Sequence, residues 1–582
     1  EITQQWGQIY KSLFLIWPYL SDNVSWDPNN LPNSSIKIES FAATYKTLKK
    51  NVQYMTDYYD NGGAESINQN VHVDHHNLGT IIDSDSTFRI YLGTDGGIFY
   101  TNSSMDPGVV DNDFKVSGKS SNNWYQPAGG YNTTQFYGAD KVVGYDQYFG
   151  GSQDNGTFLS PRNQIADETT TWSFEIGGDG FEAIAHHTDP NKLIGGSQGN
   201  NFYRSTNGGA SWNYAQYGLE GSDPFITRLS SPFQDPDVLY AVTSFGVMKS
   251  NDFGQSWQSK QVEGNWSSSF WSGTDVEVSL ANPRYVWAGS SMSFAGNIFL
   301  SKDWGETYES VPNFSNLGRT SGIYSHPTED STAYVLFGMP GAAKVLQTKD
   351  LGETWEDLSG FTNSTDGKSL NGFPDVPVYS FLVMPHNKDI MWAGTEVGLI
   401  ESTDGGTSWH LVESNLPYVT IWDLKLKDDG QIVLATHGRG VWTATIDDLK
   451  SYEPKPAILP PFILSAYQLD SEDSYVISTN INIKSSYDSL VIKANNVQRD
   501  VFQNVDKSDS TNFVFEVDDK GDYTIQAFGY KDGLEHPSNE YEIILNPTLQ
   551  PRTEYSTTFS DLVGDEFGLD RFRIGIQGGL KE

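Results

Sequence analysis

The stretch Thr348-Lys-Asp-Leu-Gly-Glu-Thr-Trp355 decides the fold, because its pattern returns at regular intervals along the chain. Four other segments align with it without gaps: Ser205-Thr-Asn-Gly-Gly-Ala-Ser-Trp212, Ser250-Asn-Asp-Phe-Gly-Gln-Ser-Trp257, Ser301-Lys-Asp-Trp-Gly-Glu-Thr-Tyr308 and Ser402-Thr-Asp-Gly-Gly-Thr-Ser-Trp409. Their final aromatic residues are 45, 51, 47 and 54 positions apart. This spacing is typical of a four-stranded propeller blade.

The residue types of the repeat predict a hairpin. The Asp at the third position, which is Asn207 in the first copy, can accept bonds from the backbone that follows it. The Gly supplies a positive φ, and the hydroxyl and the aromatic ring fix the hairpin onto the blade. The pattern resembles the Asp-box of the BNR repeat. We therefore interpret the five acidic motifs as folding devices and not as metal sites or catalytic carboxylates.

Short alternating strands with frequent turns surround the boxes, and they predict an all-β fold. Residues 1–450 read as a β-propeller of about seven to ten four-stranded blades. Two arrangements fit: one large ring, or a seven-bladed ring from about residue 135 with part of a second one. The segment Gly7–Ser12 resembles the third strand of an incomplete blade. Either N-terminal strands complete the last blade, or further blades precede this sequence.

The composition changes after residue 450. Residues 451–461 form a Pro-rich linker, and residues 462–546 alternate in about seven strands, as in a β-sandwich of immunoglobulin or fibronectin type. The tail 547–582 shows no period and stays unassigned.

The charge and the absence of cysteine exclude several classes. The 582 residues include 37 basic and 74 acidic ones, a net charge of −37, and no Cys. An acidic surface without a basic patch disfavours nucleic acid, and the lack of Cys excludes disulfides and thiolate chemistry. No apolar run reaches the roughly 18 residues of a membrane span. We expect an exported, extracellular or cell-surface protein without membrane insertion.

The first candidate site is Val71-His-Val-Asp-His-His-Asn77. Alternation predicts that His72, Asp74 and His76 share one face of a strand. Three interpretations stay open: residues that line a channel, metal ligands or structural histidines. Because an extended strand spreads these side chains over about 13 Å, they would rarely close on one ion, and we predict no metal site.

Glycine-flanked acids and amides form the second group of candidates. Carboxylates and amides beside aromatic rings suit sugar hydroxyls and sugar ring faces, although each Asp-Gly or Asn-Gly alone is also an ordinary hairpin turn. With His72 and His76, the predicted ligand-binding residues are Gln135, Tyr137, Gln153, Asp154, Asn155, Gln198, His437 and Arg439.

Several of these motifs occur in the same order in exported bacterial Asp-box propellers described as glycoside-hydrolase-like or sortilin-like. The resemblance covers roughly residues 6–447. In family 74 glycoside hydrolases, two Asp residues cut xyloglucan-type β-glucans between two propellers. The segment Gly93-Thr-Asp-Gly-Gly97 resembles the strand of their base, and Val419–Leu424 that of their acid. The resemblance implies the catalytic pair Asp95 and Asp423, with Asp74 and Asp179 as alternates.

The resulting expectation is a propeller that binds polysaccharide at the channel mouth, with hydrolysis as the sharper hypothesis. The alternative is a non-catalytic adhesin or a protein-interaction scaffold. We expect no required cofactor, although Ca²⁺ is plausible at acidic loops. The partner would be a polysaccharide, a cell-surface glycan or a protein.

Overall fold

The computed structural model describes residues 133–545 except 168, 223, 263, 265, 293–295, 316, 428 and 470–474. Before residue 133 it describes positions 72, 74–82, 88–101, 109–110, 116–117 and 124–125. The predicted strand Gly7–Ser12 and the tail 547–582 lie outside these residues. The all-β prediction is confirmed, since the elements of the described residues are strands apart from the 3₁₀ turn η4 (Asp447–Ser451).

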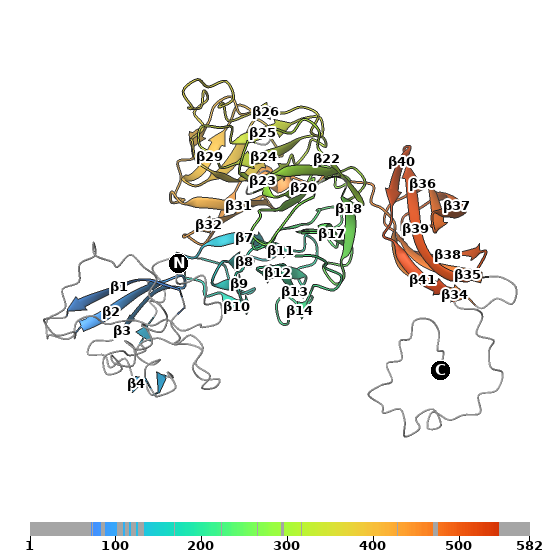
Figure 1. The fold of residues 1–582 in the computed structure, drawn as a ribbon, viewed down its shortest axis with the longest axis horizontal. Helices are drawn as coiled ribbons and strands as arrows, with labels where there is room; N and C mark the ends of the chain where they lie inside the picture. Colours follow the sequence, from blue (N-terminus) through green and yellow to red (C-terminus); the bar gives the residue numbers. More distant parts are fainter. Residues whose placement is uncertain are drawn as a thin grey trace, which may run out of the picture.

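Seven consecutive antiparallel units make a ring (Figure 1). Their innermost strands are β7 (Phe136–Lys141), β11 (Ala183–Ala185), β15 (Leu229–Ser230), β19 (Asp275–Val278), β23 (Thr320–Ser325), β27 (Val378–Val383) and β31 (Thr420–Leu426). The second strands are β8 (Tyr148–Ser152), β12 (Leu193–Ser197), β16 (Leu239–Thr243), β20 (Val286–Ser290), β24 (Ala333–Phe337), β28 (Met391–Thr395) and β32 (Gln431–His437). Of the two predicted arrangements, the described residues form the seven-bladed ring that starts near residue 135.

The outer parts of the blades follow in the same order. The third strands are β9 (Gly156–Leu159), β13 (Asn201–Ser205), β17 (Gly246–Ser250), β21 (Asn297–Ser301), β25 (Val345–Thr348), β29 (Gly398–Ser402) and β33 (Val441–Thr445). The outermost strands are β10 (Ser173–Ile176), β14 (Asn213–Tyr214), β18 (Gln258–Val262), β22 (Thr307–Ser310), β26 (Glu356–Asp357) and β30 (His410–Leu411). The seventh sheet has three strands among the described residues, and β18 pairs in parallel with β22.

Each blade packs between two others, so its second strand is buried on both faces. All five residues of β16, β20, β24 and β28 are buried. Small residues let the blades approach each other. A Cβ atom on Gly394 of β28 would lie 2.7 Å from the carbonyl oxygen of Ile421 in the next blade. This packing explains why the strands read as nearly continuous apolar runs.

The repeated box folds the turn between the third and fourth strands. In the box of the fourth blade, Ser301 Oγ donates to Asp303 Oδ1 at 2.7 Å and accepts from the Gly305 N–H at 2.8 Å. Asp303 also accepts from the N–H and the hydroxyl of Thr307, at 3.0 and 2.6 Å. In the preceding copy, Trp257 Nε1 donates to the carbonyl of Ala215 in the blade before it. The box therefore closes its own hairpin and ties one blade to another.

The last blade meets the first at the ring closure. An antiparallel bridge joins Gln135 to His437, and the Gly438 N–H donates to the carbonyl of Thr134 at 3.0 Å. Deeper in the ring, Lys427 of the seventh blade pairs with Asp140 of the first at 2.6 Å. Backbone and ion-pair contacts together close the ring.

Two further units flank the ring (Figure 1). On one side is a sheet of β1 (His75–Ile82), β2 (Phe88–Thr94), β3 (Gly97–Thr101) and β6 (Trp124–Tyr125), near the short pair β4 (Val109–Val110) and β5 (Val116–Ser117). On the other side, two sheets enclose one apolar core. They contain β34 (Phe462–Leu469), β35 (Tyr475–Ile483) and β38 (Ser508–Val517), and β36 (Tyr487–Ala494), β37 (Val497–Val505), β39 (Gly521–Lys531), β40 (Leu534–Pro537) and β41 (Tyr541–Leu545).

Polar contacts dock this C-terminal unit onto the third and fourth blades. Lys484 forms an ion pair with Asp235 at 2.6 Å, and Arg284 donates to the carbonyl of Glu535 at 2.6 Å. The immunoglobulin-type topology and the domain boundaries remain predictions. None of the helices within the described residues is long and apolar enough to span a bilayer.

We expect Ser301→Ala to lower the free energy of unfolding by about 1–3 kcal/mol, because it leaves the buried Gly305 N–H without its acceptor. Urea denaturation followed by circular dichroism measures the change. Ser510→Ala, at an exposed position of the C-terminal unit, serves as the matched control and should leave stability unchanged. Equal stability of both variants and the parent would contradict a structural role for the box.

Candidate functional site

Aromatic side chains form a continuous wall at one end of the central channel, where the inner strands begin. Tyr137 of β7 contacts Trp422 of β31 and Phe181, with ring centroids 4.5 and 5.0 Å apart. Trp422 stacks on Tyr379 of β27 at 4.5 Å and on His437 at 4.3 Å. We call this end of the ring the rim.

The wall continues from Phe181 toward the fourth blade. Phe181 contacts Phe225 at 5.2 Å, and Phe225 contacts Phe270 and Trp271 at 5.5 and 5.3 Å. Trp271 lies at the end of this series of ring contacts, and its side chain is 71% exposed. The rim aromatics thus run from the sixth blade, across the ring closure, to the segment before the fourth.

Polar groups predicted from separate motifs meet beside this wall. Tyr137 donates its hydroxyl to Gln153 Oε1 at 2.7 Å. The Asp154 N–H donates to Asp179 Oδ1 at 2.9 Å, and the Asp179 N–H donates to Gln198 Oε1 at 2.8 Å. The turns of the first two blades therefore present a linked group of acids and amides at the rim.

The sheet before the ring approaches the same turns. Asn155 Nδ2 donates to the carbonyl of Asp95, in the turn between β2 and β3, at 3.0 Å. His72 Nε2 lies 2.8 Å from the carbonyl oxygen of Asp154. His76 forms an ion pair with Asp95. The segments 71–77 and 93–97 are thus connected by hydrogen bonds to a turn of the first blade.

The electrostatics of this group centre on Asp154. Partial burial, with the nearby carboxylates of Asp95 and Asp179, raises the pKa of Asp154 to about 6. Burial likewise raises the pKa of Tyr137 to about 12, so its hydroxyl stays protonated at neutral pH. The rim offers a carboxyl that can hold or release a proton in mildly acidic solution.

One prediction about the first motif was wrong. We expected His72, Asp74 and His76 to share one face of a strand, but β1 begins only at His75. Asp74 has a φ of 60°, which interrupts the extended backbone and its alternation. Asp74 is exposed, and His76 reaches Asp95 from within β1.

The remaining predicted binding residues lie at the ring closure. Gln135 is exposed and forms its bridge to His437. Burial lowers the pKa of His437 to about 4, so the ring stacked on Trp422 is neutral at physiological pH. Arg439 donates from its guanidinium to the carbonyl of Gly438 at 2.8 Å.

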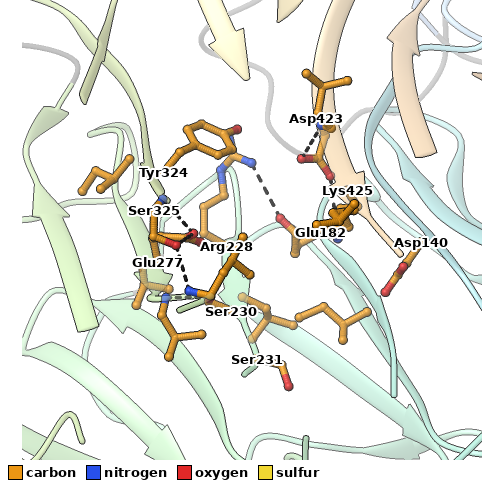
Figure 2. Close-up of a pocket in the computed structure, with 18 of the residues that line it drawn as sticks. Asp140, Glu182, Arg228, Ser230, Ser231, Glu277, Tyr324, Ser325, Asp423 and Lys425 are labelled. Carbon is orange, nitrogen blue, oxygen red and sulfur yellow. Dashed lines mark hydrogen bonds and ion pairs between the residues drawn. The ribbon is translucent and has the colours of Figure 1, made fainter. Parts of the chain in front are cut away.

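Asp423 lines the cavity within the channel, and Asp95 is not among the residues that line this cavity (Figure 2). It is 6% exposed, and its Oδ2 is 3.7 Å from Lys425 Nζ. No hydrogen bond or ion pair among the described residues joins Asp423 to Asp95. The proposed catalytic pairing of these two residues remains a prediction.

The channel contains charged residues that the sequence analysis did not select. Lys425 pairs with Glu182, and Arg228 lies 3.6 Å from Glu182 and 4.0 Å from Asp275. Glu277 Oε1 accepts two bonds from Ser325. A sequence signal existed, because in Asp275-Val-Glu277 and Asp423-Leu-Lys425-Leu-Lys427 the charges alternate with apolar residues, which predicts one charged strand face.

Burial governs protonation in the channel. It raises the pKa of Asp275 and of Asp423 to about 6, and that of Glu277 to about 8. The carboxylates around Arg228 raise the pKa of its guanidinium against the effect of burial. Among the residues that the structure covers, no group of three His, Asp or Glu side chains is arranged to hold a metal ion.

No protein-family model and no curated protein matches this sequence. Solved structures with a similar fold include YCF48 bound to the D1 peptide, at 15% identity and a TM-score of 0.39, covering 54% of this chain and 95% of that one. The GH74 enzyme of Niastella koreensis matches at 16% identity and a TM-score of 0.40, over 63% of this chain and 48% of that one. The GH74 xyloglucanase of Xanthomonas campestris matches at 13% identity and a TM-score of 0.39, over 71% and 68%. The chain thus spans about half the length of the Niastella enzyme.

The raised pKa of Glu277 predicts how stability depends on pH. The folded protein keeps this proton up to about pH 8, whereas the unfolded chain loses it near the ordinary value of 4.5. Stability from this group therefore falls as pH rises between these values. The difference in unfolding free energy between Glu277→Gln and the parent should therefore shift in favour of the variant by about 2–4 kcal/mol as the pH rises from 5 to 8.5. Urea denaturation at both pH values measures it.

The matched control is Glu540→Gln, at an exposed position. Its difference from the parent should be the same at both pH values. A Glu277→Gln difference that also stays constant would show that the channel carboxyl titrates normally.

Proposed function

We propose that this protein binds polysaccharide or cell-surface glycan at the rim. The observation that carries the proposal is the aromatic wall from Tyr379 to Trp271, with acids and amides of the first two blades beside it. Aromatic faces stack on the apolar faces of sugar rings, while carboxylates and amides bind hydroxyl groups. A wall that crosses several blades suits an extended chain of sugars better than one small ligand.

Hydrolysis of the bound glycan is the sharper form of this proposal. Glycosidases need one carboxyl that carries a proton and a second that is ionised, about 5–9.5 Å from it. Asp154 fits the first role by its raised pKa, and Asp179 and Asp95 are the carboxylates that perturb it. The resemblance favours Asp95 with Asp423, and Asp74 and Asp179 remain the alternates.

The proposal includes a place of action outside the cytoplasm. The high negative charge and the lack of Cys are compatible with an exported, cell-surface or extracellular protein. Glycan binding by the rim residues needs no cofactor. Ca²⁺ would be an additional ligand of acidic loops and not part of the reaction.

A protein partner is the second candidate, and exposed apolar residues at the rim end favour it. Trp271, Phe245 and Tyr418 are 71%, 64% and 72% exposed, and all three lie in loops at the end where the inner strands begin. Exposed apolar residues concentrated on one face are typical of interaction surfaces. In this reading the protein is an adhesin or an assembly scaffold, to which the C-terminal unit adds a second surface.

We expect Trp271→Ala to weaken glycan binding roughly five- to tenfold, since one stacking ring is worth about 1–1.5 kcal/mol. A glycan array identifies the ligand, and isothermal titration calorimetry then measures its affinity. Tyr467→Ala removes a 40% exposed ring of the C-terminal unit and should bind as the parent does. Binding that is identical in all three proteins would place the glycan site away from the rim.

If the protein is a hydrolase, Asp95→Ala and Asp154→Ala should each lower the rate of product release at least about a hundredfold, the usual contribution of an acid or a base. Chromatography of oligosaccharides released from soluble polysaccharides measures the rate. The control is Asp448→Ala, which removes an exposed carboxylate in the 3₁₀ turn η4 and should keep full activity. Binding without products from the parent would support a non-catalytic role, and no response to any glycan would favour a protein partner.

A further inference from the structure

We propose that the central channel holds a second binding site, for a small organic cation that carries a primary ammonium group. This site goes beyond the glycan site at the rim. The rim presents aromatic rings and turn residues, whereas the channel presents buried charged groups on the inner strands. The two proposals can therefore fail independently.

The cavity lies among the inner strands of the blades and has a volume of about 130 Å³ (Figure 2). Its lining combines charged residues with apolar ones, among them Val276, Ile323 and Leu382. Ligand sites have this character, since apolar walls hold the body of a ligand while a few polar groups fix its orientation.

The charges that line the cavity do not balance. Lys427 and Asp140 pair with each other at 2.6 Å. Around the rest of the cavity only two cationic side chains, Arg228 and Lys425, are among the described lining residues. They face four carboxyl groups, which are those of Glu182, Asp275, Asp423 and Glu277. Glu277 is protonated at neutral pH, so three carboxylates face the two cations. Buried charges need partners, so this excess of acids favours a cationic ligand over an anion.

One carboxylate oxygen in the cavity lacks a hydrogen-bond donor. Three aspartates of the inner strands bind backbone N–H groups. Asp140 accepts from Lys141 and Ala185, and Asp275 accepts from Val276 and Ile323, so both oxygens of each are used. The third, Asp423, differs from them.

Asp423 accepts one backbone bond, from the Leu424 N–H to Oδ1 at 2.9 Å. Its Oδ2 is buried and has no hydrogen-bond partner. Lys425 Nζ lies 3.7 Å from this oxygen, which is beyond hydrogen-bond distance. The side chain is only 8% exposed and points into the cavity (Figure 2). A buried acceptor of this kind requires a donor.

Glu277 supplies a second acceptor. Both bonds that it receives from Ser325, at 2.7 and 3.1 Å, reach the same oxygen, Oε1. The other oxygen, Oε2, carries the proton that Glu277 keeps up to about pH 8, so it accepts from a ligand only when a bound cation displaces this proton. Asp423 and Glu277 come from β31 and β19, so a ligand between them would be held from two separate blades.

An ammonium group fits these requirements. It is compact, carries one positive charge and donates three hydrogen bonds without accepting any. A metal ion fits less well, because the described residues hold no cluster of three ligand-type side chains. The apolar walls favour a cation with a carbon body over an inorganic ion. The ammonium could belong to a free amine or to an amino sugar of a glycan, and the experiment separates these two sources.

The test is isothermal titration calorimetry of the full chain at constant ionic strength and pH 7.5. The probes are methylammonium chloride, glucosamine hydrochloride and the neutral N-acetylglucosamine. We expect binding of the two ammonium compounds and at least about tenfold weaker binding of N-acetylglucosamine. Binding of methylammonium supports a free amine as the ligand, whereas binding of glucosamine alone supports an amino sugar. No binding of either ammonium compound overturns the proposal and leaves protonation as the means by which the channel is neutralised.

Variants locate the site. Asp423→Asn should weaken binding of the ammonium probe at least about tenfold, and Glu277→Gln should weaken it similarly while it keeps an oxygen for Ser325. The second variant also tests the proposal if the first one does not fold. Asp447→Asn removes a carboxylate that is 89% exposed and is the matched control, which should bind as the parent does. Equal affinity of all four proteins would overturn the assignment to the channel.

Discussion

Closure of the ring depends on charged side chains that the seventh blade extends to the first two. Lys427 reaches Asp140 and Lys425 reaches Glu182, so Lys425 of β31 and Lys427 directly after it join the end of the ring to its beginning. Loss of one partner from a buried pair costs far more than an exposed pair contributes, because an uncompensated charge remains in the interior. The channel, the rim and the contacts between blades all require that this closure holds.

The same constraint explains why the channel is charged. Seven short strands converge on one axis, and their backbone N–H groups at the edge facing the channel need acceptors. Aspartates meet this need by bridging two blades, as Asp275 does between Val276 and Ile323. Each such aspartate brings a negative charge into the interior, and lysine and arginine compensate some of it. Binding chemistry in the channel thus arises from residues that also hold the blades together.

The sequence predicts those parts of the structure that depend on contacts between residues close together in the chain. The Asp-box acts within eight residues, so its hairpins and the repeat length were readable, and the all-β prediction is confirmed. The rim motifs were recognised as separate glycine-rich turns, but the contact of Asp95 with Asn155 depends on how a sheet packs against the ring. The strand proposed for His72 and Asp74 failed because one residue, Asp74, adopts a left-handed conformation. Glu182 and Arg228 were missed because an isolated charge directly before a short strand has no local signature.

The rim and the channel are built from the same strands, so the positions of their binding residues depend on each other. On β31, Trp422 stacks in the rim wall while the next residue, Asp423, lines the cavity. Before β11, Phe181 belongs to the wall and Glu182 to the cavity. A shift of either strand along its axis would therefore move a stacking ring and a buried carboxylate together. The ion pair between Lys425 and Glu182 joins these same two strands, so it fixes the register of both surfaces at once.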